Sequence, residues 1–203
     1  MSGSKSVAPA ATGLHPDIVE RALRVAVRQH AGQLRKGDGE PFITHPVAVA
    51  LICARAGLSA ETIAAALLHD VLEDTRMTGK ELASDLGEGG EEIARIVQDV
   101  TKAGGRLSWE EKSRRYLEHL RTAPLEALAV SAADKIHNLY ALVLVYERDG
   151  DEVRARFNST LEQRVRTYEE VRDLVRERWP DCPLLSELDR RLERARATLL
   201  AGS

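Results

Sequence analysis

Cysteine and aromatic residues are scarce in this chain of 203 residues. Its only cysteines, Cys53 and Cys182, lie far apart in apolar or loop settings. This spacing excludes a disulfide framework and suits a reducing compartment, so we expect a cytoplasmic protein. Aromatic residues make up only 4% of the chain, while Ala, Leu, Val, Arg and Glu dominate it, which argues against an all-β fold.

Long apolar runs and a strong net charge are also absent. No run of about 18 apolar residues occurs, so we expect no membrane span. Residues 1–14 lack the apolar core of a secretory signal, and we predict a disordered tail there. A net charge of −3 gives no global indication of a nucleic-acid partner. Hydrophobic residues at 43% and charged residues at 30% are typical of a helical protein with one core.

Helix signals follow one another along the remaining sequence. Pro16, Asp17 and Glu20 begin a predicted helix that ends near Gly32, and the glycine- and proline-containing residues 33–44 form a predicted loop. Apolar periodicity and capping residues predict an all-α fold of about eight to ten helices, without strands or repeats. We predict one main domain over residues 15–178, with residues 179–203 as a helical extension packed on it. The later predicted helices span 45–57, 59–74, 78–87, 91–100, 108–121, 124–148, 151–178 and 183–200.

The stretch Ala64–Thr75, AAALLHDVLEDT, places polar groups at the end of an apolar helix. On a helix of about 3.6 residues per turn, His69 lies one turn before Glu73, and Asp70 one turn before Asp74. Burying these groups unpaired is costly, and a bound cation would resolve that cost. The alternative is a core histidine with a capping aspartate, followed by an ordinary acidic helix end, although acids at a helix C-terminus oppose its dipole.

Two further side chains are candidates for the same site. His45 stands in ITHP at a predicted helix start, and Asp134 stands in the apolar segment VSAADKIHNL. A buried lone carboxylate needs a partner. With His69 and Asp70 they form a set of two histidines and two aspartates. Such a set suits Mn²⁺, Fe²⁺, Co²⁺ or Zn²⁺, which can activate water and polarise a phosphoryl oxygen.

Four motifs in order carry a family resemblance: RKGDGEPFITHPVAVA, AALLHDVLEDT, IVQDVTK and AADKIHNL. Over roughly Pro16 to Tyr168, the chain resembles the HD-domain metal-dependent phosphohydrolases. Among these it resembles most the RelA/SpoT-type hydrolase domain and the stand-alone small alarmone hydrolases, which remove the 3′-pyrophosphate of (p)ppGpp. The resemblance implies a single-domain, all-α HD fold and this activity.

The resemblance also implies roles for individual residues. It assigns a metal, usually manganese, although other divalent transition metals are possible, to His45, His69, Asp70 and Asp134. It assigns the positioning and deprotonation of the attacking water to Glu73 and Asp74. It assigns substrate contacts to Arg35, Lys36, Lys102 and Asn138. Arg35 and Lys36 could alternatively form a solvated loop pair. His137 is interpreted as an ordinary packing or surface histidine.

The segment DKIHNLYAL departs from the family pattern. Lys135 stands where arginine is common, and Tyr140 and Ala141 stand where arginine and threonine are common. Because the last two positions flank the nucleotide in the family, another nucleotide or a phosphorylated cofactor stays open as substrate, as does a non-catalytic nucleotide-binding regulatory module. We expect a small-molecule nucleotide partner, no nucleic acid, no membrane, and a monomer or small homo-oligomer. The sequence ends at Ser203 without a synthetase-like region, so we expect a hydrolase only.

Overall fold

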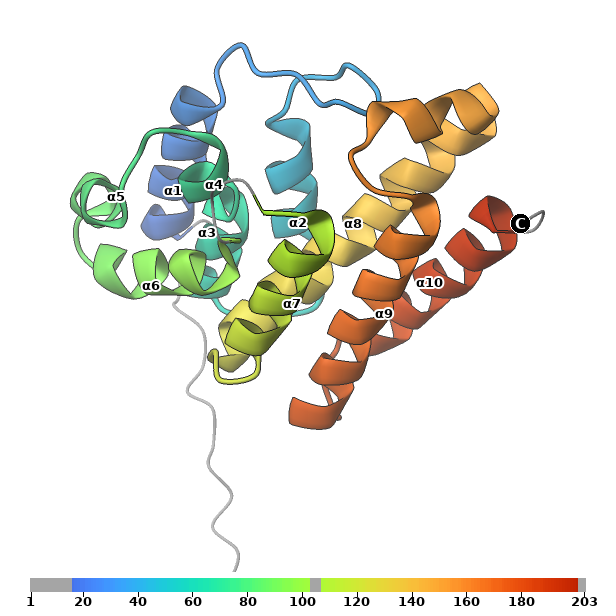
Figure 1. Ribbon diagram of the computed structural model, residues 1–203. Helices are drawn as coiled ribbons and strands as arrows, with labels where there is room; N and C mark the ends of the chain where they lie inside the picture. Colours follow the sequence, from blue (N-terminus) through green and yellow to red (C-terminus); the bar gives the residue numbers. More distant parts are fainter. Residues whose placement is uncertain (1–15, 103–106, 201–203) are drawn as a thin grey trace, which may run out of the picture.

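The computed structural model describes residues 16–102 and 107–200. Over these ranges it contains helices and no strand, with one isolated backbone bridge between Leu34 and Pro41. The predicted all-α class is therefore confirmed for the described residues, while the predicted tail over 1–14 lies outside them. The elements are α1 (Asp17–Gln29), α2 (Thr44–Arg55), α3 (Ala60–Leu68), α4 (Val71–Asp74), α5 (Gly79–Leu86), α6 (Gly90–Val100), α7 (Trp109–Leu120), α8 (Leu125–Asp149), the 3₁₀ helix η1 (Gly150–Arg156), α9 (Leu161–Arg178) and α10 (Leu185–Leu199) (Figure 1).

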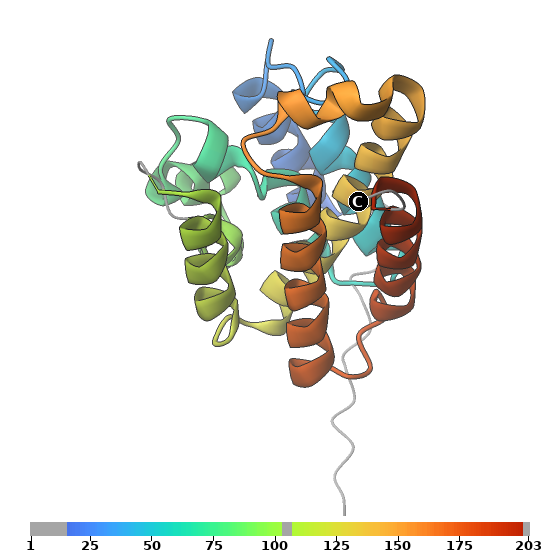
Figure 2. The same cartoon turned by 45° about the vertical axis from the view of Figure 1, so that its right-hand side comes forward.

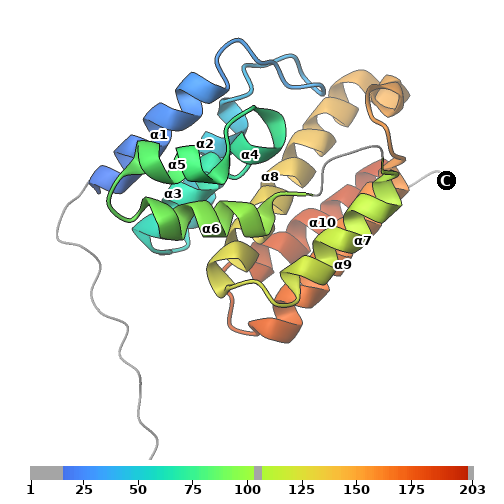
Figure 3. The same ribbon diagram turned by 60° about the vertical axis from the view of Figure 1, so that its left-hand side comes forward.

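Helix α8 runs through the middle of the molecule. It packs against α2, α3 and α6 on one side and against α9 and α10 on the other (Figures 1 and 3). An unbroken run from 127 to 136 is buried, as its apolar sequence predicts. Many of these residues are alanines, which let neighbouring helices approach closely.

The expectation of no membrane span meets one exception in the described residues. The helical segment Leu125–Arg156 is long and apolar enough to cross a membrane by length and composition. However, 72% of its most apolar window is buried inside the fold, as in the core helix of a globular protein.

The predicted helix over residues 59–74 is interrupted, so the prediction of one continuous helix is wrong. Ser59 caps its start by accepting a hydrogen bond from the Thr62 amide, as predicted. Helix α3 then ends at Leu68, and the short helix α4 follows after Asp70. On a continuous helix, His69 and Asp70 would diverge by about 100°. The interruption lets both side chains turn toward one point.

The predicted helix over residues 151–178 is also divided, which corrects a second prediction. Residues 150–156 form η1, and α9 begins at Leu161 after a capping box between Thr160 and Gln163. The pattern Thr-x-x-Gln was visible in the sequence and could have located this start. Helix α10 packs on α8 and α9 (Figure 2). The division at residues 178 and 179 stays a prediction.

Candidate metal centre and adjoining cavity

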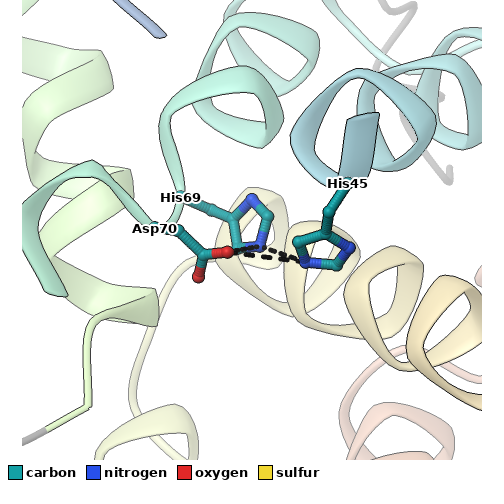
Figure 4. A group of neighbouring side chains, drawn as sticks. All are labelled: His45, His69 and Asp70. Carbon is teal, nitrogen blue, oxygen red and sulfur yellow. Dashed lines mark hydrogen bonds and ion pairs between the residues drawn. The ribbon is translucent and has the colours of Figure 1, made fainter. Parts of the chain in front are cut away.

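Three elements bring the candidate metal ligands together. His45 comes from the first turn of α2, and His69 and Asp70 come from the interruption between α3 and α4 (Figure 4). Asp134 comes from the buried part of α8. Because α8 packs against both α2 and α3, its carboxylate reaches the two imidazoles. Residues 89 positions apart in the sequence thus share one site.

The spacing of the ligand atoms suits a metal ion. The His45 Nε2 atom lies 3.1 Å from His69 Nε2 and 3.5 Å from Asp70 Oδ2, and His69 Nε2 lies 3.2 Å from Asp70 Oδ2. The Asp134 Oδ1 atom lies 3.1 Å from His45 Nε2 and 3.8 Å from His69 Nε2. A metal with ligands at about 2.1 Å separates adjacent ligand atoms by about 3.0–3.4 Å. Three of these side chains form a group that could hold a metal ion: His45, His69 and Asp70.

Hydrogen bonds at the far side of each imidazole orient its Nε2 atom toward this point. The Nδ1 atom of His69 lies 2.8 Å from the Ala66 carbonyl oxygen, so it must donate. The Nδ1 atom of His45 lies 2.8 Å from Nδ1 of His137. Such outer partners fix the tautomer of a ligating histidine. His137, interpreted from sequence as a packing or surface residue, was missed, although it stands three positions after Asp134 on the same helix.

The electrostatics of the centre favour a cation. Burial would raise the pKa of Asp70, but His69 and His45 outweigh burial and hold that pKa well below its usual range. Burial would likewise raise the pKa of Asp134, and Lys135 and the two histidines lower it instead. Burial would lower the pKa of His69, but Asp70 and Asp134 raise it, so a proton occupies His69 when no ion is bound. A metal ion would replace that proton.

Asp134 is held by two further side chains of its own helix. Its Oδ2 atom accepts a hydrogen bond from Lys135 Nζ, and its Oδ1 atom accepts one from Asn138 Nδ2. Lys135 is buried, with Nζ 5.0 Å from the Tyr116 ring centroid and 5.7 Å from that of Tyr168. Lys135 therefore acts on the carboxylate from behind, a role that sequence reasoning did not assign.

A cavity of about 490 Å³ adjoins the metal centre. Every predicted site residue lines it except His69, which is buried. Ala141 also lines the cavity. Tyr140 is not among the lining residues: 44% of it is exposed and its ring lies under Arg191. The predicted residues that line the cavity are Arg35, Lys36, His45, Asp70, Glu73, Asp74, Lys102, Asp134 and Asn138.

The two acids predicted to handle water lie on α4. The Glu73 Oε2 atom is 3.8 Å from Lys102 Nζ and accepts a hydrogen bond from the Lys102 amide at 3.4 Å. Partial burial and the negative charges of Asp70 and Glu73 raise the pKa of Asp74 to about 6. A carboxyl group with this pKa can accept and release a proton near neutral pH.

The loop before α2 delivers the predicted basic pair. The Arg35 amide donates to the Glu40 carbonyl at 2.9 Å, which closes the loop. The Gln33 side-chain amide donates to the Asp74 carbonyl at 3.2 Å and ties the loop to α4. Arg35 and Lys36 thus face the same cavity as the acids of α4. The lining residues that the sequence did not reveal include Phe42, Phe157 and Arg164, because no local pattern marks an aromatic or arginine as facing a cavity.

Comparison with known proteins places this architecture among related chains. A model of the HD domain matches residues 22–179. The chain is 40% identical over 126 residues to a probable GTP pyrophosphokinase of Mycobacterium leprae, covering 60% of this chain and 15% of that protein. It is 37% identical over 131 residues to a guanosine-3′,5′-bis(diphosphate) 3′-pyrophosphohydrolase of Aquifex aeolicus, covering 63% of this chain and 18% of that protein. The chain therefore spans less than a fifth of these relatives.

Solved structures share the fold. One is a metazoan ortholog of SpoT described as hydrolysing ppGpp, with a TM-score of 0.72, 24% identity, and coverage of 90% of this chain and 98% of that one. Another is a protein of Listeria monocytogenes EGD-e, with a TM-score of 0.63, 31% identity, and coverage of 77% and 98%. The predicted HD-type helical fold is confirmed by these likenesses.

Proposed function

This chain belongs to the HD-domain family, and we propose that it is a metal-dependent phosphohydrolase that removes the 3′-pyrophosphate of (p)ppGpp. The products would be GDP or GTP and pyrophosphate. One observation carries the proposal most directly: four ligand side chains and two further acids meet beside a cavity lined by basic side chains. Relatives named as 3′-pyrophosphohydrolases of this nucleotide support the choice of substrate.

The side chains of the centre divide the work. His45, His69, Asp70 and Asp134 would hold a divalent ion, for which we propose Mn²⁺ because mixed imidazole and carboxylate ligands suit it. When bound, the ion supplies Lewis acidity to the phosphoryl oxygen and lowers the pKa of water. The Asn138 amide and Lys135 ammonium fix the Asp134 carboxylate in place.

The acids of α4 would handle the proton of the attacking water. Glu73 is oriented by Lys102, so its carboxylate is positioned to bind water. Asp74, with its pKa raised to about 6, would accept the proton from that water. A positioned general base of this kind contributes about 10²–10⁴-fold to the rate.

The basic side chains would neutralise the substrate. Lys36 and Arg35 come from the loop before α2, and Lys102 follows α6, so they border the cavity from different elements. Preorganised cations facing a developing negative charge stabilise a phosphoryl transition state.

The two cysteines are free and buried, in line with our prediction of a cytoplasmic protein. The prediction of a monomer or small homo-oligomer also stands.

The test is a hydrolysis assay that detects pyrophosphate and phosphate separately. Purified protein with Mn²⁺ should release pyrophosphate from ppGpp, with GDP in equal amount. Asp70→Ala should abolish release, and Asp74→Asn should lower kcat by about 10²–10⁴-fold. Asp181→Asn, at an exposed position, is the matched control and should retain full activity. No release at high enzyme concentration, with bound Mn²⁺ confirmed, contradicts the proposal.

A second candidate function rests on the departure at Ala141. An alanine in the cavity wall, where the family carries threonine, suits a differently shaped nucleotide or phosphorylated cofactor. A substrate panel in the same assay separates the two candidates, because a different preferred substrate would favour this one. Nucleotide binding without any turnover at saturating Mn²⁺ would instead identify a regulatory binding module.

A further inference from the structure

The loop that carries Arg35 and Lys36 meets η1 at one end of the cavity. We call residues 33–43, between α1 and α2, the basic loop. In Figures 1 and 2 this loop, in blue, passes beside the segment that follows α8, in orange. Four residues at its tip line the cavity, as does Phe157 directly after η1: Arg35, Lys36, Gly37 and Asp38. The two segments therefore border the same cavity.

Hydrogen bonds within the basic loop fix the shape of its tip. The Arg35 amide donates to the Glu40 carbonyl at 2.9 Å, and the Gly39 amide donates to the Arg35 carbonyl at 3.0 Å. The Asp38 carboxylate accepts from the Glu40 amide at 3.1 Å and lies 3.7 Å from Arg35 Nε. Because these bonds join neighbours within one short turn, they do not determine where the turn lies relative to the metal centre.

One hydrogen bond joins the tip of the basic loop to the rest of the fold. The Nη1 atom of Arg156 donates to the Gly37 carbonyl oxygen at 2.8 Å, across 119 positions of sequence. Among the described residues, no other hydrogen bond links residues 35–40 to a segment outside the loop. The Phe157 ring lies beside the same glycine, since a Cβ atom on Gly37 would be 3.7 Å from Phe157 Cζ. A charged donor and an aromatic ring thus hold the tip at one point.

Arg156 is itself fixed to the helix that carries a candidate metal ligand. Its Nη1 atom also donates to Asp149 Oδ2 at 2.6 Å, and Arg148 binds both oxygens of that carboxylate. Hydrogen bonds from Arg148 and Arg156 hold the pKa of Asp149 well below its usual range, so its charge persists near neutral pH. Asp149 is the last residue of α8, the helix that brings Asp134 to the metal centre. The tip of the loop is therefore placed against the same helix as the metal centre.

We propose that Arg156 is a positioning residue that fixes the basic loop, so that Arg35 and Lys36 face the phosphates of the substrate. Without its bond to Gly37, the tip would keep its shape but lose its placement. The substrate would then have to order the loop on binding, which costs conformational entropy. Arg156 is not among the residues that line the cavity, so it acts through the loop. The phosphate-binding role of the loop rests on the proposed function, whereas its ordering by Arg156 does not.

Hydrogen–deuterium exchange tests the positioning role without relying on hydrolysis. In the Mn²⁺-loaded full chain, Arg156→Gln should raise the exchange rate of the basic-loop amides about 10-fold. Arg156→Lys, which keeps a charged donor but loses the planar fork, should fall between. Arg154→Gln is the matched control, because Arg154 lies in the same 3₁₀ helix and its side chain is 38% exposed against 30% for Arg156. It pairs with Asp151 and Glu162 instead of the loop, so its loss should leave loop exchange unchanged.

Kinetics test whether the placement of the loop serves substrate binding. For ppGpp, Arg156→Gln should raise KM about 10-fold and change kcat by less than about threefold. The kcat value is retained because other elements hold the metal centre and the acids of α4. Arg154→Gln should leave both constants at their parent values. Adding Asp149→Asn to Arg156→Gln should raise KM no further, since both substitutions act through the same bond to the loop.

Three outcomes would overturn the inference. The first is unchanged exchange of the basic-loop amides in Arg156→Gln. The second is an equal rise in loop exchange or KM in Arg154→Gln, which would make the effect a general loss of stability. The third is a fall in kcat while KM stays at the parent value. Loop exchange that depends on Arg156, in a protein that does not hydrolyse ppGpp, would support the positioning role and contradict the proposed function. Hydrolysis of ppGpp with loop exchange independent of Arg156 would do the opposite.

Discussion

Asp74 brings a negative charge to a part of the cavity that already holds two other carboxylates. Burial and the nearby charges of Asp70 and Glu73 raise its pKa to about 6. The folded protein therefore binds the Asp74 proton more tightly than the unfolded chain does. The bound proton therefore stabilises the folded state relative to the charged form below about pH 4. This contribution decreases as pH rises from about 4 to 6, and above about pH 6 the charged carboxylate destabilises the fold. The raised pKa also makes the Asp74 carboxylate suited to accept a proton.

The unfavourable negative charge of Asp74 predicts that Asp74→Asn stabilises the metal-free protein while reducing hydrolysis. In the presence of a chelator, Tm at pH 7.5 should be higher for the variant than for the parent. The difference should shrink as pH falls through 6 and vanish near pH 4, where both forms are neutral. Thermal unfolding followed by circular dichroism across this range measures it, with Asp181→Asn as the exposed control. An equal Tm at pH 7.5 would contradict the raised pKa.

His137 sets the tautomer of a candidate ligand from outside the centre. Burial, followed by repulsion from Arg35 and from His45 in its protonated form, lowers the pKa of His137 to about 4, so its ring is neutral at pH 7 and can accept at Nδ1. That leaves Nε2 of His45 free for the ion. We expect His137→Phe to weaken Mn²⁺ binding about 10–100-fold. Isothermal titration measures the affinity, and His119→Phe, at an exposed histidine, should not change it.

At the scale of elements, the interruption between α3 and α4 forms the metal centre. It turns adjacent residues of one segment toward a histidine from α2 and an aspartate from α8. The outer support of this segment comes from α6, which packs against α3, and from α5, which packs against α6 and α1. The close packing of α5 against α6 therefore supports the metal centre.

Gly90 permits that close approach of α5 and α6. A Cβ atom on Gly90 would lie 2.3 Å from the Ala83 carbonyl oxygen, which is backbone and cannot rotate away. We expect Gly90→Ala to lower the free energy of unfolding by about 1–3 kcal/mol through overpacking. Gly79→Ala is the matched control, since its Cβ would meet only the exposed Gln98 side chain, which can move. Urea unfolding of both variants measures the difference, and equal stabilities would contradict this account of the packing.

At the scale of the whole molecule, α8 connects the two groups of helices and carries functional groups along its buried length. Asp134 and Asn138 line the cavity, and Lys135 donates a hydrogen bond to the Asp134 carboxylate from behind it. An ion bound at the centre would hold α2, the α3–α4 segment and α8 to one another. Metal binding should therefore stabilise the entire fold.

We expect Mn²⁺ at about 100 times its Kd to add about 2.7 kcal/mol to the free energy of unfolding. For a chain of 203 residues, this raises Tm by about 5–11 °C. The raised pKa of His69 means that the ion displaces a proton, so the increase should be larger at pH 8 than at pH 6. Differential scanning calorimetry with and without a chelator measures it. Asp70→Asn should lose the increase, and its persistence in that variant would place the ion elsewhere.

The sequence by itself determined the fold class, several helix starts and the identity of the polar cluster. Capping residues such as Ser59 and Thr78 act within one turn of the chain, so a local pattern suffices to find them. The burial of the first half of α8 followed from its mostly apolar composition. The motif order, with the His69–Asp70 pair inside an apolar segment, indicated the family that the comparisons confirm.

Only the tertiary structure decided how these groups meet. No glycine or proline marks the interruption at His69 and Asp70. The partners of these two side chains, His45 of α2 and Asp134 of α8, come from distant parts of the sequence. The pairing of His137 with His45 and the stacking of Arg164 between two rings join residues far apart in the sequence. Such contacts depend on packing between helices, which composition and periodicity do not encode.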